Sequence, residues 1–524
     1  MTTTTTTAAS SASSLPILRL AALRLTLVAG LLGFGANALF VNQPLGLNFL
    51  LFTIVVLAAL VVLAALERVR PAWRNVWLAA PLMCFAAMVA VRAEPFVTFL
   101  NVGAALGLAL LLVYLFSSGR LTSFNVWDYV MAAVFTGVEA GFVRPGLVLA
   151  AASNEAARPG GSSRHVWAVA RGLAISAPIL IIFTVLLTSA DAAFNQTVLD
   201  ALKFLSLDNI PELMLRILIT GIVGWVSAGG LAYALRDSAV MQSAEVSGER
   251  GGRLGFTEAG IVLFSVNALF STFVAIQFWY FFGGQSNIAV AGFTYAEYAR
   301  RGFAELVMVA LFTLGLGLAL QSFTRRQTPL AIVGFNALCV LLVILTSIIL
   351  ASAFQRLLLY EEAYGFTRLR TYPHVFMVWV GVLLGAFLIT TLINRPRLFV
   401  FGVFLAALGF VASLNVLNTD VFIARQNIVL FQSTGKLDAL YLATLSDDAI
   451  PEVLPLLNSP DEATRTIIGG ALHYRWNELE TMTPDGVGPG WHWARSRTYA
   501  LLTQHLKEIE QYEPEQYYWR MPID

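Results

Sequence analysis

The stretch LNFLLFTIVVLAALVVLAAL, residues Leu47–Leu66, contains no charged residue and no proline. An α-helix rises about 1.5 Å per residue and the hydrocarbon core of a bilayer is about 30 Å thick, so about 20 apolar residues can cross it. The stretch therefore predicts a transmembrane helix. Comparable runs recur as far as Leu414 and together predict an all-α fold, a polytopic transmembrane helix bundle.

The composition of the 524-residue chain agrees with this class, because 57% of its residues are hydrophobic and only 12% are charged. Soluble proteins carry about 25% charged residues. The net charge is +1, and no clustered basic surface of the kind that binds nucleic acid is evident. Cys84 and Cys339 both fall in apolar runs, which favours packing residues over a disulfide or a metal pair.

Hydropathy predicts about eleven to twelve spans. The segments are 18–40, 47–66, 76–91, 97–116, 173–188, 213–235, 259–282, 303–320, 330–350, 375–392 and 398–414. Residues 129–151 are also apolar but carry Glu139, Arg144 and Pro145, so they form a twelfth span, a re-entrant hairpin or an interfacial helix. Arginines in the short loops predict a cytoplasmic N-terminus, and an outside C-terminal region if 129–151 does not cross.

Three parts follow from this pattern. Residues 1–16 are a Thr/Ser/Ala-rich tail that is predicted to be disordered, and residues 17–415 form the helix bundle. Residues 416–524 lack a long apolar run, and acidic residues outnumber basic ones there. Apolar spacing in LDALYLATL (437–445) and WARSRTYALLTQHLKEIEQY (493–512) predicts helices, so this part is expected to be a small soluble acidic helical domain.

Polar and ionisable residues near the spans are the candidates for functional contacts, because they are costly inside a membrane. They fall into four clusters: Asp191; Asn267, Gln277 and Tyr280; Glu297, Arg300, Arg301 and Glu305; and Arg356, Glu361, Arg368 and Arg370. The third and fourth clusters are expected to emerge on the same face. They would form a shared charged vestibule there, where paired arginines suit a phosphate or a carboxylate.

Each cluster also has a structural interpretation. The Asp191 carboxylate can lie in water at the membrane interface, and the Asn267 amide can bond a neighbouring helix. Arg301 lies four residues from both Glu297 and Glu305, so the third cluster can be an interfacial elbow held by helical ion pairs. In the fourth cluster, Gly365 is placed to end a helix.

Five motifs occur in order along the chain: SADAAF (189–194), NALFSTFVAIQFWYFFGG (267–284), YAEYARRGFAEL (295–306), YEEAYGFTRLR (360–370) and NTDVFIARQN (418–427). In these motifs, over residues 173–457, the chain resembles the bacterial polytopic membrane proteins called domain of unknown function 4153/4173. The resemblance implies an integral membrane protein with a soluble C-terminal extension. It implies no established reaction and therefore supplies no catalytic residues.

Several activities lack their signatures. No histidine falls within a predicted span, which argues against a haem with paired axial ligands, and no lysine lies mid-span for a Schiff base. GxxxxGK[ST], HExxH and GxSxG are absent. No cofactor and no metal site is expected. The missing signatures argue against an enzyme, but this question stays open.

Three functions stay open for a multi-pass protein of the bacterial cytoplasmic membrane. The first is a transporter or channel-like bundle with the charged extracytoplasmic vestibule as its entrance. The second is a signalling or scaffold protein that presents residues 416–524 to a protein partner. The third is a lipid-linked transferase with Asp191, Glu361 and Glu362 on the outer face. The partners considered are the lipid bilayer, a small-molecule or lipid ligand and a protein, but not nucleic acid.

Overall fold

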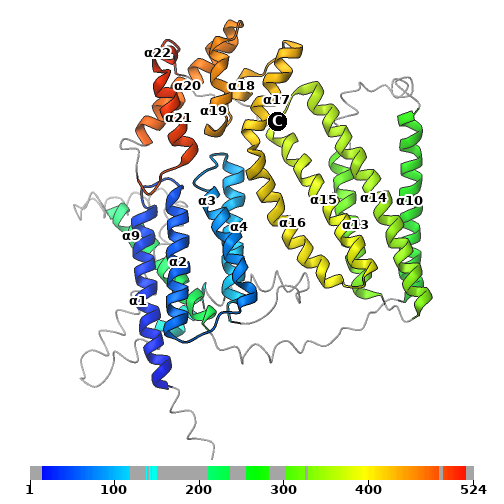
Figure 1. Cartoon of the computed structure of the whole chain (residues 1–524), viewed down its shortest axis with the longest axis horizontal. Helices are drawn as coiled ribbons and strands as arrows, with labels where there is room; N and C mark the ends of the chain where they lie inside the picture. The colour runs from blue at the N-terminus through cyan, green and yellow to red at the C-terminus, as the bar shows by residue number, and fades with distance from the viewer. Residues whose placement is uncertain are drawn as a thin grey trace, which may run out of the picture.

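The structure, a computed structural model, describes residues 15–117, 137–138, 141–142, 144–149, 210–235, 255–282, 303–324, 328–482 and 488–514. Within these ranges nine helices are long and apolar enough to cross a membrane. They lie side by side, and shorter helices stack on one end of the bundle (Figure 1). The predicted all-α membrane bundle is confirmed.

The membrane-length helices are α1 (Leu15–Phe40), α2 (Leu47–Leu66), α4 (Pro95–Leu115), α9 (Ile210–Ala234), α10 (Phe256–Phe282), α13 (Phe303–Phe323), α14 (Pro329–Tyr364), α15 (Arg368–Leu392) and α16 (Pro396–Leu417). Helix α2 has the bounds that its uninterrupted apolar run predicts. The last turns of α14 and the first turns of α15 continue past the apolar cores of these helices. The polar side chains in these turns form hydrogen bonds and ion pairs with other parts of the protein.

The predicted span at 76–91 differs in detail from one continuous helix. The 3₁₀-helix η1 (Trp73–Leu78) leads directly into the short helix α3 (Ala79–Met88). With a rise of about 2.0 Å per residue for the first and 1.5 Å for the second, the pair is about 27 Å long, close to the thickness of the hydrocarbon core. Two short helices therefore supply the length expected of one.

Two other predicted segments are described only in part or not at all. Residues 173–188 lie outside the described residues. Of 129–151, the described pieces pack on α9: the Trp225 indole donates a hydrogen bond to the Gly141 carbonyl (2.7 Å), and the Arg144 guanidinium lies 5.1 Å from the centroid of the Tyr233 ring. The twelfth span, the re-entrant hairpin and the interfacial helix all stay predictions for residues 129–151.

Close helix contacts give the first half of the bundle its shape. Helices α1 and α9 pack backbone to backbone, since a Cβ on Gly33 would lie 2.3 Å from the Thr220 carbonyl oxygen. Only glycine permits this approach. Helix α16 contacts both α4 and α15, and the side-chain amides of Asn101 (α4) and Asn415 (α16) exchange hydrogen bonds of 3.0 and 2.6 Å. Helix α16 thus joins the first half to α10, α13, α14 and α15.

The chain after α16 forms helices of its own, here called the C-terminal helices: α17 (Thr419–Thr434), α18 (Ala439–Ala443), η5 (Asp447–Ala449), α19 (Ile450–Val453), η6 (Leu454–Asn458), α20 (Glu462–Met482), α21 (Trp493–Gln504) and α22 (Leu506–Ile509). They bury a separate apolar core that includes Leu442, Ile468, Leu472 and Leu502. Helices are found where the spacing at 437–445 and 493–512 predicts them. The soluble character of residues 416–524 stays a prediction.

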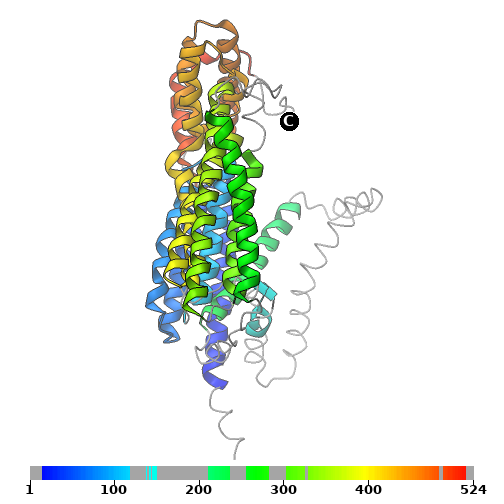
Figure 2. The same ribbon diagram turned by 90° about the vertical axis from the view of Figure 1, so that its right-hand side faces the viewer.

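The bundle has two distinct ends. The C-terminal helices stack on one of them, here called the capped end, which includes the segments 41–46, 89–94 and 365–367. The opposite end, here called the far end, includes the start of α1 and the segments 67–72 and 393–395 (Figures 1 and 2). The described N-terminal helix therefore begins at the end opposite the C-terminal helices.

Candidate functional site

Arg368, the first residue of α15, is the centre of a buried charged cluster at the capped end. Its Nε and Nη2 atoms donate to the two carboxylate oxygens of Asp420 at 2.8 and 2.6 Å. This two-bond geometry is the strong form of an arginine–carboxylate contact. Asp420 lies in the first turn of α17, is fully buried, and also accepts a hydrogen bond from the Ser446 backbone N–H (2.7 Å). One carboxylate therefore connects α15, α17 and the start of η5.

Two more ion pairs extend this cluster to the segment before α4. Glu94 caps the N-terminus of α4, and its other carboxylate oxygen lies 3.6 Å from Arg368 Nε. Arg92 Nη1 lies 3.5 Å from Asp448 Oδ1, while Asp448 Oδ2 accepts from the Ala93 backbone N–H at 2.6 Å. These charged residues, hereafter the joint, are Arg92, Glu94, Arg368, Asp420 and Asp448.

Burial sets the electrostatics of the joint. Removal from water raises the pKa of Asp448, although the Ala93 N–H and Arg92 oppose that change. Burial likewise raises the pKa of Tyr441, whose neutral hydroxyl accepts a hydrogen bond from the Arg368 backbone N–H (2.7 Å). Buried charges are tolerated only when they are paired. The joint meets this condition because its carboxylates face Arg92 and Arg368.

A second contact attaches the C-terminal helices to the first half of the bundle. The Leu47 N–H donates to the Trp491 carbonyl and the Trp493 N–H donates to the Ala90 carbonyl, both at 2.8 Å. A Cβ on Gly46 would lie 2.4 Å from the Trp491 carbonyl oxygen, so only glycine fits there. His492 lies between, with Nε2 3.2 Å from the Arg92 carbonyl oxygen. Together with the joint, this contact binds the C-terminal helices to both halves of the bundle.

The environment of His492 disfavours its charged form. Burial, together with the neighbouring Arg495 guanidinium, lowers the pKa of His492 to about 4, and the contact with the Arg92 carbonyl opposes this change. His492 is 3% exposed. At neutral pH the imidazole is therefore neutral.

Glu361, a predicted site residue, pairs with a histidine. Its Oε2 atom lies 2.9 Å from His374 Nδ1, and His374 Nε2 lies 3.3 Å from the Phe354 carbonyl oxygen. Glu361 is 1% exposed. His374 lies in the first turns of α15, which begins at Arg368, before the predicted start of the span at Val375. The joint holds the polar first turns of α15 that hydropathy excludes from the span.

The remaining arginines of the fourth cluster lie nearby on α14 and α15. The Arg370 guanidinium lies 4.3 Å from the centroid of the Tyr360 ring and donates to the carbonyls of Tyr364 and Gly365. Gly365 ends α14 with a φ of +80°, at the position that its sequence context predicts. Arg356 is half-buried on α14. Arg370 therefore caps the end of α14.

The second cluster lies on α10, inside the bundle. The Asn267 amide nitrogen donates to the Leu338 carbonyl of α14 at 3.0 Å, and its buried Oδ1 accepts no hydrogen bond from the described residues. Gln277 is half-buried on the same helix, and its Nε2 also has no hydrogen-bond partner among the described residues. The Tyr280 side chain lies outside the described residues. Asn267 thus bonds a neighbouring helix with only one of its polar atoms.

The third cluster and the first are barely described. Glu305 is exposed in the first turn of α13. Asp191, Glu297, Arg300 and Arg301 lie outside the described residues. The shared charged vestibule therefore stays a prediction.

Sequence reasoning missed several residues of the joint. Arg92, Glu94 and Asp448 are not among the predicted site residues, although VRAEP (91–95) places two charges in a very short connection between apolar segments. That density of charge beside a span was the available signal. Nothing local indicates that the partner is Asp448, which follows far later in the chain.

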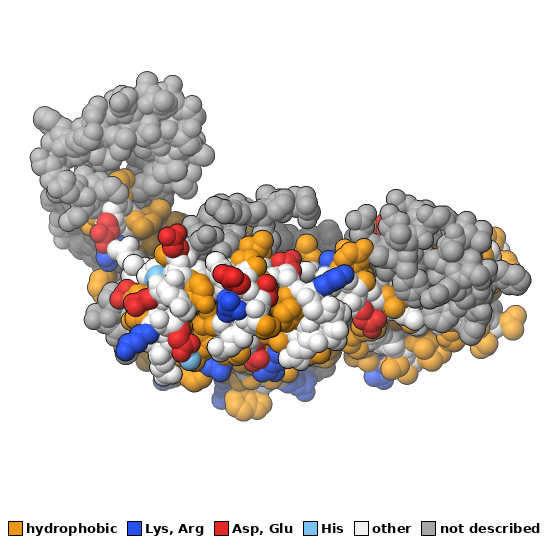
Figure 3. Space-filling model, turned by 90° about the horizontal axis from the view of Figure 1, so that it is seen from above, with side chains coloured by type: hydrophobic (Ala, Val, Ile, Leu, Met, Phe, Trp, Pro, Cys, Tyr) orange, Lys and Arg blue, Asp and Glu red, His pale blue; other side chains and the backbone are white. Residues whose placement is uncertain are grey.

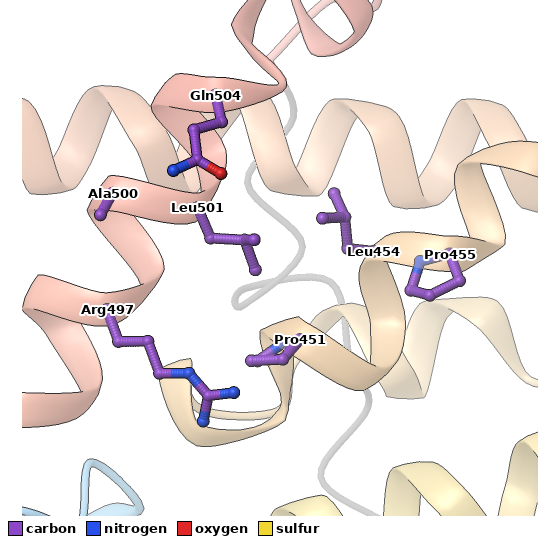
Figure 4. Close-up of a pocket in the computed structure, with 7 residues that line it drawn as sticks. All are labelled: Pro451, Leu454, Pro455, Arg497, Ala500, Leu501 and Gln504. Carbon is purple, nitrogen blue, oxygen red and sulfur yellow. The ribbon is translucent and has the colours of Figure 1, made fainter.

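A surface pocket of about 330 Å³ lies on the C-terminal helices between α21 and the α19–η6 segment. Apolar side chains of Leu454 and Leu501 face each other across it, and Arg497 lies at one end (Figure 4). Seen from above, basic and acidic side chains are interspersed with apolar ones over this part of the molecule (Figure 3). Among the residues that the structure describes, no group of three or more His, Cys, Asp or Glu could hold a metal ion.

Comparison with known proteins gives a family but no individual relative. Neither the curated proteins nor the solved structures contain a match. The model of the family described as Domain of unknown function (DUF4153) matches residues 78–456, from the end of η1 to the middle of η6. The match includes all five residues of the joint and continues past residue 416 into the C-terminal helices. Because it covers well over half of the chain, this multi-pass membrane protein belongs to the family described as Domain of unknown function (DUF4153).

Proposed function

We propose that this protein is a membrane scaffold of the bacterial cytoplasmic membrane, whose bundle holds the C-terminal helices in one orientation for a protein partner. The joint is the observation that carries the proposal. Its buried charges bond to one another across α4, α15, α17 and η5. Charges arranged in this way fix two parts of a molecule together.

The bonding of the predicted site residues favours a scaffold over a vestibule. Arg368 is bound by Asp420, Glu361 pairs with His374, and Arg370 caps α14. A transported ion or a bound substrate would have to displace these contacts, and leaving one member of a buried pair uncompensated costs about 3–5 kcal/mol. A transferase that uses Glu361 would face the same cost.

The distribution of arginine supports an outer position for the C-terminal helices. Arg68, Arg70 and Arg395 lie in short loops at the far end, where the first described helix begins. Arginine in short loops is enriched on the cytoplasmic side. The capped end would then face outward, and the pocket beside Arg497 would be open to an extracytoplasmic partner.

A site-specific crosslinking experiment tests the scaffold. A photo-crosslinking residue replaces the exposed Gln504 at the pocket, or the exposed Lys436 as a control, in cells that carry the full chain. We expect one protein to crosslink at Gln504, not at Lys436, and the product to decrease strongly when Asp420→Ala loosens the joint. Crosslinking that is unchanged by Asp420→Ala, with the chain still inserted, would contradict the proposal.

Transport is the second candidate, and Asn267 is the observation that favours it. Its buried Oδ1 on a membrane-length helix accepts no hydrogen bond from the described residues, as expected of a group that meets water or a substrate. The test replaces Cys84 and Cys339 by Ala, introduces Asn267→Cys, and adds a membrane-impermeant thiol reagent. Rapid labelling, as fast as that of the exposed control Gln504→Cys, would support an aqueous path, and absence of labelling would support the scaffold.

A further inference from the structure

The segment that follows α2 carries arginine side chains with no ion pair, hydrogen bond or ring contact to the residues that the structure describes. Among the arginine side chains that the structure describes, most have an ion pair, a hydrogen bond or a ring contact. The exceptions are Arg68, Arg70, Arg74, Arg395 and Arg497, and all but Arg497 lie at the far end. The unpaired guanidiniums thus gather at one end of the bundle.

Three of them lie within a single short segment. Arg68, Arg70 and Arg74 are all exposed, and they stand between the last apolar turn of α2 and the start of η1. The end of α2 and the start of η1 lie where the apolar part of the bundle ends. The segment between them therefore lies at the surface of the membrane. Unpaired guanidinium groups at that level match the position of lipid phosphates.

Two tryptophans flank the arginines. Trp73 is 82% exposed and Trp77 is 40% exposed, and the Trp77 ring packs edge-on against Phe401 of α16 at 6.4 Å between centroids. Tryptophan favours the headgroup level of a bilayer, where its ring is apolar and its N–H group can bond. The two tryptophans therefore indicate that the segment lies at the level of the lipid headgroups. The neighbouring arginines lie at the same level.

The protein holds this segment in place before any ligand arrives. The Ala72 N–H donates to the Phe116 carbonyl at 2.6 Å, and the Asn75 amide donates to the Leu115 carbonyl at 2.9 Å. Arg68 adopts the left-handed conformation with a φ of +56°, which turns the chain sharply after α2. Binding to a preformed segment loses little entropy of ordering.

We infer that Arg68, Arg70 and Arg74, with Trp73, form a binding site for the phosphate of an anionic phospholipid headgroup at the far end. Guanidinium forks bind phosphate with two parallel hydrogen bonds. The inner leaflet of a cell membrane is rich in anionic lipid, and a basic residue near its surface adds about 1 kcal/mol to attraction. The inference shares with the proposed function the cytoplasmic position of the far end, but it does not depend on the scaffold role, and its binding test can fail separately.

Native mass spectrometry of the purified full chain with phosphatidylglycerol tests the site. The variant Arg68→Gln/Arg70→Gln/Arg74→Gln is compared with Arg425→Gln/Lys436→Gln/Arg497→Gln, which removes the same charge from exposed residues of the C-terminal helices. We expect the first variant to bind phosphatidylglycerol about 100-fold more weakly, from three contributions of that size, and the second to bind like the wild type. Phosphatidylcholine should bind equally to all three proteins.

Two results would overturn the inference. The first is equal loss of phosphatidylglycerol in both variants, which would mean that only net charge matters. The second is full displacement of the lipid by millimolar inorganic phosphate, which would identify a site for soluble anions. Arg68→Lys/Arg70→Lys/Arg74→Lys keeps the charge, so partial binding by that variant would support the role of the guanidinium forks. Equal melting temperatures would establish that each variant is folded.

Discussion

The two ends of the bundle use arginine in opposite ways. At the capped end Arg92 and Arg368 are largely buried and bonded to carboxylates from distant parts of the chain. At the far end Arg68, Arg70 and Arg74 are exposed and have no partner within the described residues. The same side chain therefore joins two parts of the protein at one end and is offered to the surroundings at the other. Burial and the presence of carboxylates decide between these roles.

The largest expected effect comes from opening the joint. Asp420→Ala leaves the Arg368 guanidinium largely buried without its main partner, which should destabilise the protein by about 3–5 kcal/mol. Thermal unfolding of the detergent-purified protein measures the change. The triple variant Arg368→Met/Asp420→Leu/Glu94→Gln removes the charges of both ion pairs that Arg368 makes and should recover much of the stability. If Asp420→Ala melts like the wild type, the joint does not hold the C-terminal helices.

Acid should weaken the same end through His492. A folded-state pKa of about 4 lies below the ordinary value of 6.5, so the unfolded chain binds the proton more tightly and stability falls as the pH drops from 6.5 to 4. At pH 5 the loss is about 2 kcal/mol. The pKa of Asp448 is raised in the folded protein, so protonation of this carboxylate makes acidification stabilising. This effect opposes that of His492.

A substitution isolates the histidine from Asp448. The melting temperatures of the wild type and His492→Gln are compared at pH 7 and pH 5, where Asp448 contributes equally to both proteins. We expect the wild type to lose more stability than the variant on acidification. Parallel curves would show that His492 does not titrate in this window.

An exposed ion pair at the capped end should contribute little. Arg425 Nη2 lies 2.8 Å from Glu452 Oε1, but the Arg425 side chain is 63% exposed. Water and salt screen such pairs, so they contribute little to stability. Arg425→Ala should therefore change the thermal unfolding of the protein far less than Asp420→Ala. An equal loss would mean that exposure does not distinguish the two pairs.

The smallest effect on stability is expected at the far end. Replacing Arg68, Arg70 and Arg74 by Gln removes exposed side chains without partners, so the free energy of unfolding in lipid-free detergent should change by about 0.5 kcal/mol or less. Added phosphatidylglycerol should raise the melting temperature of the wild type more than that of this variant. A large loss in the absence of lipid would mean that these arginines have a structural role.

Hydropathy was sufficient for the membrane helices because each depends on a local run of apolar residues. Helix α2 has its predicted bounds, whereas α15 begins earlier than its apolar core indicates. The first turns of α15 are polar and become part of the helix through Asp420, which lies on α17. The hydropathy of residues near Arg368 does not indicate a bond to a residue on another helix.

The candidate site was predicted less completely for the same reason. Arg368 and Glu361 were identified as costly residues near a membrane, but their partners Asp420 and His374 come from other helices. A spacing of three or four residues within one helix can indicate an ion pair between neighbouring turns. Pairs across the joint instead depend on tertiary structure. The residue types were therefore predictable, while their roles required the fold.

The attachment at Gly46 has a consequence for the order in which the molecule is made. The loop between α1 and α2 emerges early from the ribosome, but its partner Trp491 is made only after all the described membrane-length helices. Until then, the Leu47 N–H and the Ala90 carbonyl lack their hydrogen-bond partners. A chain that stops before residue 491 would leave this part of the capped end open to quality-control proteases, so the contact closes only after the bundle has been synthesised.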